Sequence, residues 1–195
     1  VAREDTLIGA AIVSDTVRPE AAATIQQLAA LGITRLVMLT GDNAAAAAAV
    51  GAAVGIEDRR SDLLPDDKVA AVRSIQAEDG PTAMVGDGIN DAPSLATADI
   101  GIVMGDIGSD AAIASADVVL VGDDLAKLVR AATFSRHVLR RIWQNIFVFA
   151  LGFNALAVIV ASMGWISPVI AACLHQVSSL IVVTNSLRLL VDGQA

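Results

Sequence analysis

Two long uncharged runs near the C-terminal end limit what this chain can fold into. Residues 146–163 are 18 consecutive residues without a charge, and residues 169–187 are 19 more. Runs of this length predict helices that cross a membrane, and the Gly- and Pro-containing segment 164–168 between them predicts a turn. We therefore expect transmembrane helices at residues 146–163 and 168–190. A buried hairpin in a soluble core is the alternative, which two such runs in one small core make unfavourable.

Charge is divided unevenly along the chain, whose net charge is −8. Residues 1–124 hold 7 Lys and Arg against 20 Asp and Glu, whereas residues 125–195 hold 6 Lys and Arg and one acid. The basic residues flank the uncharged runs, which by the positive-inside rule places both ends of the hairpin in the cytoplasm. We expect an integral protein of the plasma membrane, in contact with lipid, with a cytoplasmic acidic domain. The acidic surface excludes nucleic acid as a partner and suits a divalent cation.

The acidic part alternates short apolar runs with helical patterns. Strands are predicted at residues 7–14, 36–39, 82–85, 100–104 and 118–121, with helices after Pro19, from Ala44 and from Pro65. This alternation predicts an α/β domain with a parallel sheet covered on both faces. Ligands of such sheets bind beyond the carboxyl ends of the strands. The stretches TGDN (residues 40–43) and GDGIND (residues 86–91) both follow strands, so we expect them at one rim.

The GDGIND stretch has the residue types of a phosphate and magnesium site. Gly86 and Gly88 permit tight backbone geometry and the close approach of a ligand. Asp87 and Asp91, with Asn90 between them, place oxygen atoms at a strand end and in the first turn of the next helix, which suits Mg²⁺ beside a phosphoryl group. The alternative, that these residues only cap and turn, fits one such stretch better than several that converge.

Two further stretches offer groups to the same rim. Thr40 has a hydroxyl for a phosphate oxygen, and Asp42 follows it in TGDN. Lys68 begins a helix in the stretch PDDK (residues 65–68), where its ammonium group can neutralise negative charge. Together with GDGIND, these stretches predict phosphoryl-transfer chemistry.

The chain resembles the heavy-metal-transporting branch of the P-type ATPases. The matching stretches are DTVRP (residues 15–19), TGDN, PDDK, MVGDGINDAPSLATADIGIVMG (residues 84–105) and GSDAAIASADVVLVGDDL (residues 108–125), followed by the basic helix and the paired spans. The resemblance covers nearly the whole chain. It implies that residues 1–124 are the later part of a phosphorylation domain of the haloacid-dehalogenase-like, Rossmann-like fold, that residues 125–145 are a stalk helix, and that the last two membrane helices follow.

The resemblance also implies roles for individual residues, with ATP and Mg²⁺ as cofactors. Asp87 would bind Mg²⁺, supported by Asp91, which with Asp42 and Lys68 also belongs to the cofactor-binding set. Thr40 and Lys68 would contact the transferred phosphoryl group, Asp42 would line the nucleotide and phosphate cleft, and Asn90 would support the Mg²⁺ site. The implied catalytic set is Thr40, Gly41, Asp42, Lys68 and Asn90.

These pumps form an aspartyl phosphate on the Asp of an Asp-Lys-Thr-Gly-Thr motif, at the end of the first strand of this sheet. The 195 residues contain no such motif. We therefore expect a fragment that partners with the remainder of a pump and that alone neither forms the phosphoenzyme nor transports. The alternatives are a membrane-tethered phosphatase of the same superfold, for which Asp15 is the nearby nucleophile, and a non-catalytic module that docks on a pump.

Polar residues inside the spans are candidates for binding the transported ion: Asn154 in the first, and His175, Ser178 and Ser179 on one face of the second. The alternative for Ser and Asn is hydrogen bonding between helices. The copper branch carries Tyr-Asn and Met-x-x-Ser-Ser where this chain has Phe153-Asn154 and a histidine before Ser-Ser. Loss of the thioether disfavours copper, and the histidine resembles branches that handle zinc, cobalt or manganese. The ion stays open among these four.

Overall fold

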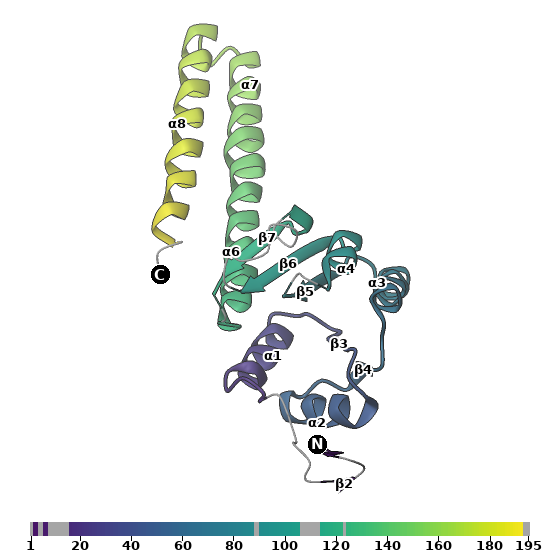
Figure 1. Ribbon diagram of the computed structural model, residues 1–195. Coiled ribbons are helices and arrows are strands. Elements are labelled where there is room, and N and C mark those ends of the chain that lie inside the picture. Colours follow the sequence, from purple (N-terminus) through teal and green to yellow (C-terminus); the bar gives the residue numbers. More distant parts are fainter. Residues whose placement is uncertain are drawn as a thin grey trace. The chain divides into compact units, whose positions relative to one another are not determined.

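The computed structural model describes residues 2–3, 6–7, 16–87, 90–105, 114–122 and 124–192 (Figure 1). The chain separates into two compact units, residues 1–129 and 130–195. The first unit contains short parallel sheets and helices, and the second is a helical hairpin. Helix α6 (Ala126–Trp143) begins in the first unit and continues into the second.

The strands of the first unit that follow residue 16 pair in parallel, as predicted. They are β3 (Val37–Leu39), β4 (Asp58–Arg60), β5 (Ala83–Gly86), β6 (Ile100–Gly105) and β7 (Val118–Val121). The described residues form two separate groups, β3-β4 and β5-β6-β7, in place of one continuous sheet. Parallel pairing places the carboxyl ends of the strands in each group at one edge. TGDN follows β3 at such an edge, and Asp87 follows β5 at such an edge.

The helices of the first unit that precede α6 include two whose starts are capped by side chains. The helices are α1 (Ala21–Ala30), α2 (Ala44–Val54), α3 (Pro65–Asp79) and α4 (Ala92–Thr97). Asn43 caps the alanine-rich α2 by accepting a hydrogen bond from the N–H of Ala46 at 2.9 Å, and Gly55, with a φ of 82°, ends it. Pro65 opens α3, where the carboxylate of Asp67 accepts from the N–H of Leu64 at 3.0 Å.

The core of the first unit lies between α3, α4 and the β5-β6-β7 sheet. Leu95 of α4 is fully buried and packs with Val103 of β6 and with the partly buried Met84. Val72 of α3 is 1% exposed. A Cβ atom added at Gly101 would lie 2.7 Å from the carbonyl oxygen of Leu95, so only glycine lets α4 lie this close to β6. This packing fixes α4, and with it Asp91, against the end of β5.

Arg35 joins three elements of the first unit. Its guanidinium donates to the carboxylate of Asp58 in β4 at 2.8 Å, to that of Glu78 at the end of α3 at 2.8 Å, and to that of Asp79. These bonds, the one to Glu78 foremost, raise the pKa of Arg35 above its ordinary value, and the guanidinium in turn lowers the pKa of Glu78. β3 begins two residues after Arg35. The arginine therefore ties the start of β3 to β4 and to the end of α3.

The N-terminal prediction is only partly covered by the structure. β1 (Ala2–Arg3) and β2 (Thr6–Leu7) pair antiparallel, so the start of the strand expected at residues 7–14 lies in a short hairpin. Residues 8–15, with Asp15 of DTVRP, and Gly88 of GDGIND lie outside the described residues.

The second unit is a hairpin in which one long helix lies beside another (Figure 1). α6 continues into a π-helix, η1 (Gln144–Phe153), and then α7 (Asn154–Ser162); α8 (Pro168–Asp192) returns. The continuous helices Ala126–Ser162 and Val169–Leu189 are long and apolar enough to cross a membrane, and 6% of each apolar window is buried. That low burial is unlike the core helix of a soluble protein.

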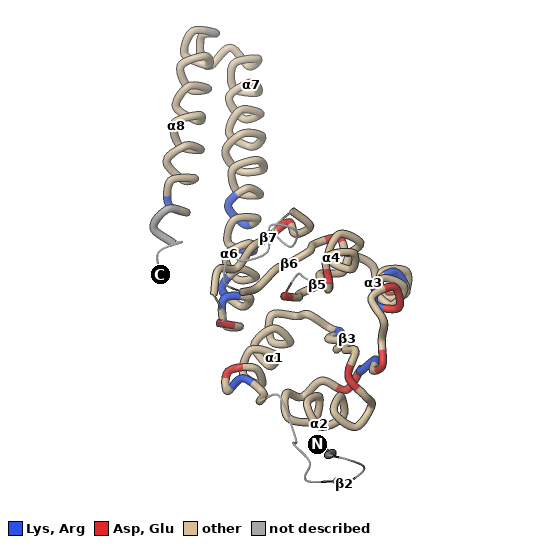
Figure 2. Tube along the Cα trace, in the orientation of Figure 1, with Lys and Arg blue, Asp and Glu red and all other residues tan. Residues whose placement is uncertain are grey.

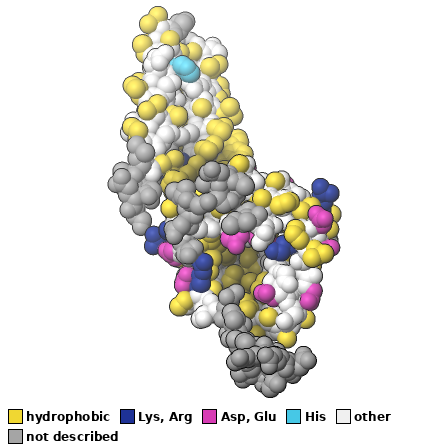
Figure 3. Space-filling view, in the orientation of Figure 1, with side chains coloured by type: hydrophobic (Ala, Val, Ile, Leu, Met, Phe, Trp, Pro, Cys, Tyr) yellow, Lys and Arg dark blue, Asp and Glu magenta, His cyan; other side chains and the backbone are white. Residues whose placement is uncertain are grey.

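Charge and apolar surface are separated on this hairpin. Figure 2 shows Lys and Arg on α6 and near the end of α8, and neither acids nor bases along α7. Figure 3 shows hydrophobic side chains over the visible face of the hairpin. The large apolar side chains that are exposed include Leu156, Val158, Leu180 and Val183, each at least 56% exposed. Helices with this surface suit an apolar solvent better than water.

Candidate active site and candidate ion site

The TGDN loop forms a compact turn at the carboxyl end of β3. The N–H of Thr40 donates to the carbonyl oxygen of Arg60 at 3.0 Å, which continues the β3-β4 pairing by one residue. The Thr40 hydroxyl donates to the Asp42 carboxylate at 3.1 Å and accepts from the N–H of Asp42 at 3.1 Å. A Cβ atom added at Gly41 would lie 3.3 Å from the carbonyl oxygen of Leu63. The loop therefore holds a hydroxyl and an exposed carboxylate side by side.

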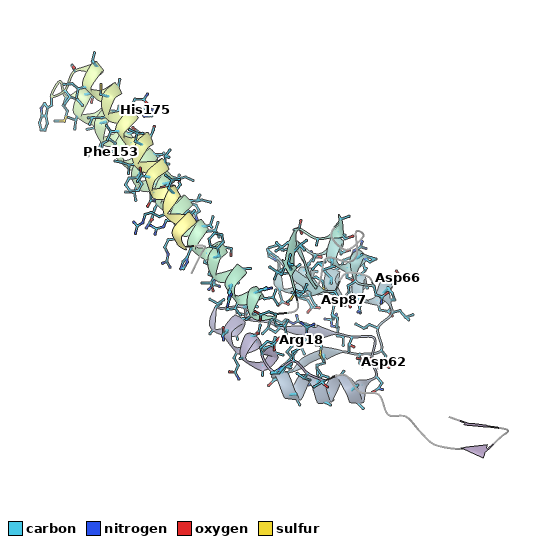
Figure 4. The ribbon with its side chains drawn as sticks, turned by 60° about the vertical axis from the view of Figure 1, so that its left-hand side comes forward. Arg18, Asp62, Asp66, Asp87, Phe153 and His175 are labelled. Atoms are coloured by element: carbon cyan, nitrogen blue, oxygen red, sulfur yellow. The ribbon has the colours of Figure 1, made fainter. Side chains whose placement is uncertain are left out.

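The segment before α3 holds this loop by backbone hydrogen bonds. The sequence pattern did not predict this support. The N–H of Asp62 donates to the carbonyl oxygen of Asp42 at 2.8 Å, and the N–H of Leu63 donates to that of Thr40 at 3.1 Å. Asp62 has a φ of 55°, a left-handed conformation that Asp tolerates better than most residues. Figure 4 shows Asp62 on the segment between β4 and α3, Asp66 at the start of α3, and Asp87 at the end of β5.

Lys68 and Asp91 form an ion pair between α3 and the start of α4. The Nζ atom of Lys68 donates to Oδ1 of Asp91 at 2.7 Å, and the two side chains are 16% and 15% exposed. The sequence predicted that both residues serve the phosphate site but not that they bind each other across 23 residues. An ammonium group has three N–H donors, so Lys68 keeps donors for a phosphate oxygen while it holds Asp91.

Gly86 makes room for Asp91. A Cβ atom added at Gly86 would lie 2.8 Å from Oδ2 and 3.0 Å from Cβ of Asp91, closer than real Cβ atoms approach. The glycine pattern predicted space for a ligand, whereas the Asp91 side chain fills that space. The glycine therefore acts by letting α4 begin directly beside the strand end.

The oxygen atoms around Asp87 fit a magnesium ion. Asp87 follows β5 and is exposed, and Asn90 is exposed. Lys68 binds Oδ1 of Asp91, which leaves Oδ2 as the second oxygen of that carboxylate. Among the described residues no three His, Cys, Asp or Glu side chains converge as a metal-binding group. Magnesium is commonly held by one or two carboxylates with waters and substrate phosphates in its other positions, so this sparse set of oxygen ligands fits it.

Four of the predicted residues of the first unit form two pairs. Thr40 contacts Asp42, and Lys68 contacts Asp91. Within the described part of the chain, no hydrogen bond or ion pair joins one pair to the other. The pairs stand at the carboxyl ends of strands that belong to the two separate sheet groups.

The candidate ion residues of the hairpin separate into different contacts. Nδ1 of His175 lies 3.0 Å from Oδ1 of Asn154 on the other helix. The Ser178 hydroxyl, 2% exposed, donates to the carbonyl oxygen of Phe149 at 2.8 Å, a bond between the two helices. The Ser179 hydroxyl donates to the carbonyl oxygen of His175 at 3.3 Å within its own helix. Figure 4 shows His175 and Phe153 in the same part of the hairpin.

Comparison with known proteins decides the family. A family model described as a haloacid dehalogenase-like hydrolase matches residues 1–99. The chain belongs to this family of haloacid dehalogenase-like hydrolases. That assignment confirms the predicted fold class, a haloacid-dehalogenase-like domain with parallel strands.

The similarity to individual proteins covers the hairpin as well as the domain that the family model matches. The chain is 43% identical to the probable cadmium-transporting ATPase of Staphylococcus aureus (strain MRSA252) and 45% identical to the manganese-exporting P-type ATPase of Mycobacterium tuberculosis (strain ATCC 25618 / H37Rv), in each case over 97% of this chain and 26% of the relative. The chain thus spans about a quarter of the length of these relatives.

A solved structure is similar to both units of this haloacid dehalogenase-like hydrolase. A zinc-transporting PIB-type ATPase in its E2.Pi state matches 90% of this chain and 28% of that protein, with a TM-score of 0.83 and 41% sequence identity. The resemblance to heavy-metal P-type ATPases that the motifs indicated is confirmed by these matches.

Proposed function

We propose that this chain is part of an ATP-driven transition-metal pump, in which phosphoryl transfer in the acidic domain is coupled to ion movement through the membrane. The observation that carries the proposal is the Lys68–Asp91 pair beside the exposed Asp87, on a chain that continues into two helices fit to cross a membrane. A phosphatase needs the first feature alone. A pump needs both, and the similarity to metal-transporting ATPases runs through both.

The phosphorylated aspartate is proposed to come from a strand outside these 195 residues. Among the described residues, β3 pairs with β4 alone and β5 with β6 alone, which leaves the other edge of each strand for a further partner. A strand placed there would carry its C-terminal residues to the TGDN loop and to Asp87. This arrangement accounts for the division of the parallel strands into two groups, and the family's nucleophile at the end of such a strand supports it.

Each candidate residue then has a distinct task. Lys68 is fixed by Asp91, and its remaining N–H groups donate hydrogen bonds to an oxygen of the transferred phosphoryl group. The Thr40 hydroxyl donates to a second oxygen once it leaves Asp42, and Gly41 lets the loop approach closely. Bound Mg²⁺ supplies positive charge opposite the phosphoryl oxygens.

Asp87 and Asn90 are proposed to hold that Mg²⁺ and the waters around it. Asp91 contributes mainly by fixing Lys68, with its second oxygen turned toward the strand end at Gly86. ATP, whose phosphates carry the metal, is the proposed phosphoryl donor. Asp42 lines the cleft that its phosphates enter.

The hairpin is proposed to cross the plasma membrane with both ends in the cytoplasm. Arg140 and Arg141 precede the apolar part of the first helix, and Arg188 ends that of the second. Trp143 and Trp165 stand at opposite ends of the first span, as interfacial anchors do. Membrane lipid covers the exposed apolar side chains, together with other helices of the pump.

The transported ion is proposed to bind near His175. Relatives and solved neighbours are named for cadmium, manganese, copper or zinc. An imidazole nitrogen suits divalent zinc or cobalt and accepts manganese, whereas the absence of a thioether at this position disfavours Cu(I).

The test uses the native full-length protein in source-cell membranes. An antibody against residues 84–105 is expected to detect a mass several-fold above the 19.9 kDa of this chain. The purified protein should form a hydroxylamine-sensitive phosphoenzyme from ATP that requires Mg²⁺ and responds to a transition metal. Phosphatase activity without a phosphoenzyme from ATP would favour the tethered phosphatase. A 19.9 kDa protein that copurifies with an intact pump would favour the regulatory module.

A further inference from the structure

The side-chain amide of Asn154 is oriented by the backbone of its own helix. Its Nδ2 atom lies 2.6 Å from the carbonyl oxygen of Ala150. A carbonyl oxygen only accepts hydrogen bonds, so the nitrogen end of the amide must face it and the oxygen end must face away. This contact lies where the π-helix η1 gives way to α7, because Asn154 is the first residue of α7. Asn154 therefore presents Oδ1, an acceptor, to the other helix.

His175 on α8 meets this oxygen. Its Nδ1 atom lies 3.0 Å from Oδ1 of Asn154. Because that oxygen has no proton to give, Nδ1 carries the proton in the hydrogen bond. In a neutral imidazole the second nitrogen, Nε2, is then unprotonated and has a free lone pair. The geometry selects one of the two neutral forms of the ring.

A second contact between the helices fixes the position of His175 relative to Asn154. Ser178, one helical turn after His175, donates its hydroxyl to the carbonyl oxygen of Phe149, the residue before Ala150. Ser178 is 2% exposed, so the bond lies inside the packed seam of the hairpin. It sets the rotation of α8 against the first helix, and this rotation turns His175 toward Asn154.

We propose that Asn154 is a positioning residue that holds His175 as its Nδ1-protonated tautomer and leaves Nε2 to bind the transported divalent cation. The proposal rests on the proposed function of His175 as an ion ligand, and it removes Asn154 from the candidate ligands. Histidines that bind metals commonly donate the other ring N–H to an oxygen, and loss of such a partner lowers metal affinity by about 10- to 100-fold.

The structure also shows what the hairpin does not supply. Its described residues bring no group of three His, Cys, Asp or Glu side chains together. In this proposal the hairpin supplies one oriented imidazole nitrogen, from His175, and other helices of the pump would supply the remaining ligands. A single neutral nitrogen among such ligands suits a borderline divalent ion such as Zn²⁺ or Co²⁺.

The experiment uses the native full-length protein in lipid vesicles, with Zn²⁺ as the probe. Asn154→Leu removes both polar atoms at similar size, and Asn154→Asp keeps an accepting oxygen. Asn145→Leu is the matched control, because Asn145 on the same helix bonds to Ser186 and Asn185 and not to His175. The readouts are the KM for Zn²⁺ in ATP hydrolysis, the kcat at saturating Zn²⁺, and the ¹⁵N resonances of the His175 ring, assigned by difference from His175→Ala.

In the unsubstituted protein without metal, Nδ1 is expected to give the protonated and Nε2 the unprotonated resonance, and Zn²⁺ should shift Nε2. Asn154→Leu should raise the KM about 10-fold or more, with a smaller change in kcat and mixed tautomers. Asn154→Asp should keep the tautomer and most of the affinity. Asn145→Leu should leave the KM and the ring resonances unchanged.

The inference and the proposed function fail differently. A protonated Nε2 in the unsubstituted protein overturns the inference without any variant that must fold. If His175→Ala abolishes Zn²⁺ stimulation while Asn154→Leu changes neither KM nor tautomer, the inference is wrong and the ion site stands. If His175→Ala leaves Zn²⁺ stimulation intact, the proposed ion site at His175 is wrong, and the inference falls with it.

Discussion

The Nζ atom of Lys68 lies 2.7 Å from Oδ1 of Asp91, and both side chains are more than four-fifths buried. The pair connects the first turn of α3 to the residue that precedes α4. It brings a positive charge to the end of β5, because Asp91 lies against Gly86 there. In the proposed function, local stability and phosphoryl chemistry would therefore depend on the same two side chains.

Replacement of Lys68 by Met should destabilise the start of α4. Asp91 would keep its partial burial and lose its cationic partner, which costs about 1–3 kcal/mol. Amide hydrogen exchange of α4 in the intact protein measures this as faster local opening. Asp66→Asn, a charge change at an exposed position of the same helical turn, is the control and should change little. Equal exchange rates in both variants would show that the pair does not stabilise α4.

Replacement of Gly86 by Ala should displace Asp91. The new methyl group would start 2.8 Å from Oδ2 of Asp91, and such overpacking costs about 1–3 kcal/mol. Amide exchange of α4 and Mg²⁺-dependent phosphoenzyme formation should both be impaired. In an Asp91→Ala background the same change should cost less, because part of the clash is gone. Additive effects of the two substitutions would place the strain elsewhere.

Replacement of Asp87 by Asn should abolish Mg²⁺-dependent phosphoenzyme formation without loss of stability. The side chain is exposed, so its charge serves no packed neighbour, whereas a divalent ion needs that charge. A Mg²⁺ titration of phosphoenzyme formation in the intact protein, with amide exchange as the folding control, measures both effects. Normal phosphoenzyme levels at ordinary Mg²⁺ concentration would contradict the assignment of Asp87.

Acid should loosen the connection between α3 and β5 through Asp99. Hydrogen bonds from the side chain of Gln76 and from the N–H of Thr82 lower the pKa of Asp99 below its ordinary 3.8. Because the folded-state pKa is the lower one, the stabilisation is complete above pH 3.8 and is lost as the pH falls through the folded pKa.

Pepsin cleavage near residues 76–100 of the intact protein, followed from about pH 5 to about pH 2, measures this loss. The unsubstituted protein should resist better than Gln76→Leu near pH 5, and the difference should shrink in acid. Asp99→Asn is the control, since in that background the effect of Gln76→Leu should not depend on pH. A difference that grows as the pH falls would contradict the sign.

Sequence patterns predicted the elements whose causes are local. The alanine-rich α2 follows a capping asparagine, α3 starts at a proline, and strands β5, β6 and β7 are apolar runs, so their boundaries were found to within a few residues. The two apolar helices were found for the same reason, since a long uncharged run has few other structures open to it. The parallel pairing was likewise predicted from the alternation of strands and helices.

Elements that depend on distant partners were missed. β4, with sequence Asp58-Arg59-Arg60, has charged residues that are uncommon in strands and becomes one only by pairing with β3. The π-helix η1 has no periodic signal in a uniformly apolar run. The contact of Gly86 with Asp91 was also not predicted, because a glycine pattern shows that space is needed but not which group fills it.

Arg35 makes the stretch from β3 to the end of α3 a candidate for one cooperative unit of opening. Its carboxylate partners lie 23 to 44 residues further along the chain, so the guanidinium closes a loop around β4, the TGDN turn and most of α3. Regions closed in this way tend to exchange their amide hydrogens together. A fluctuation that frees the last turn of α3 would then reach the loop that holds Thr40, so local unfolding at the end of α3 would be linked to the proposed phosphate site.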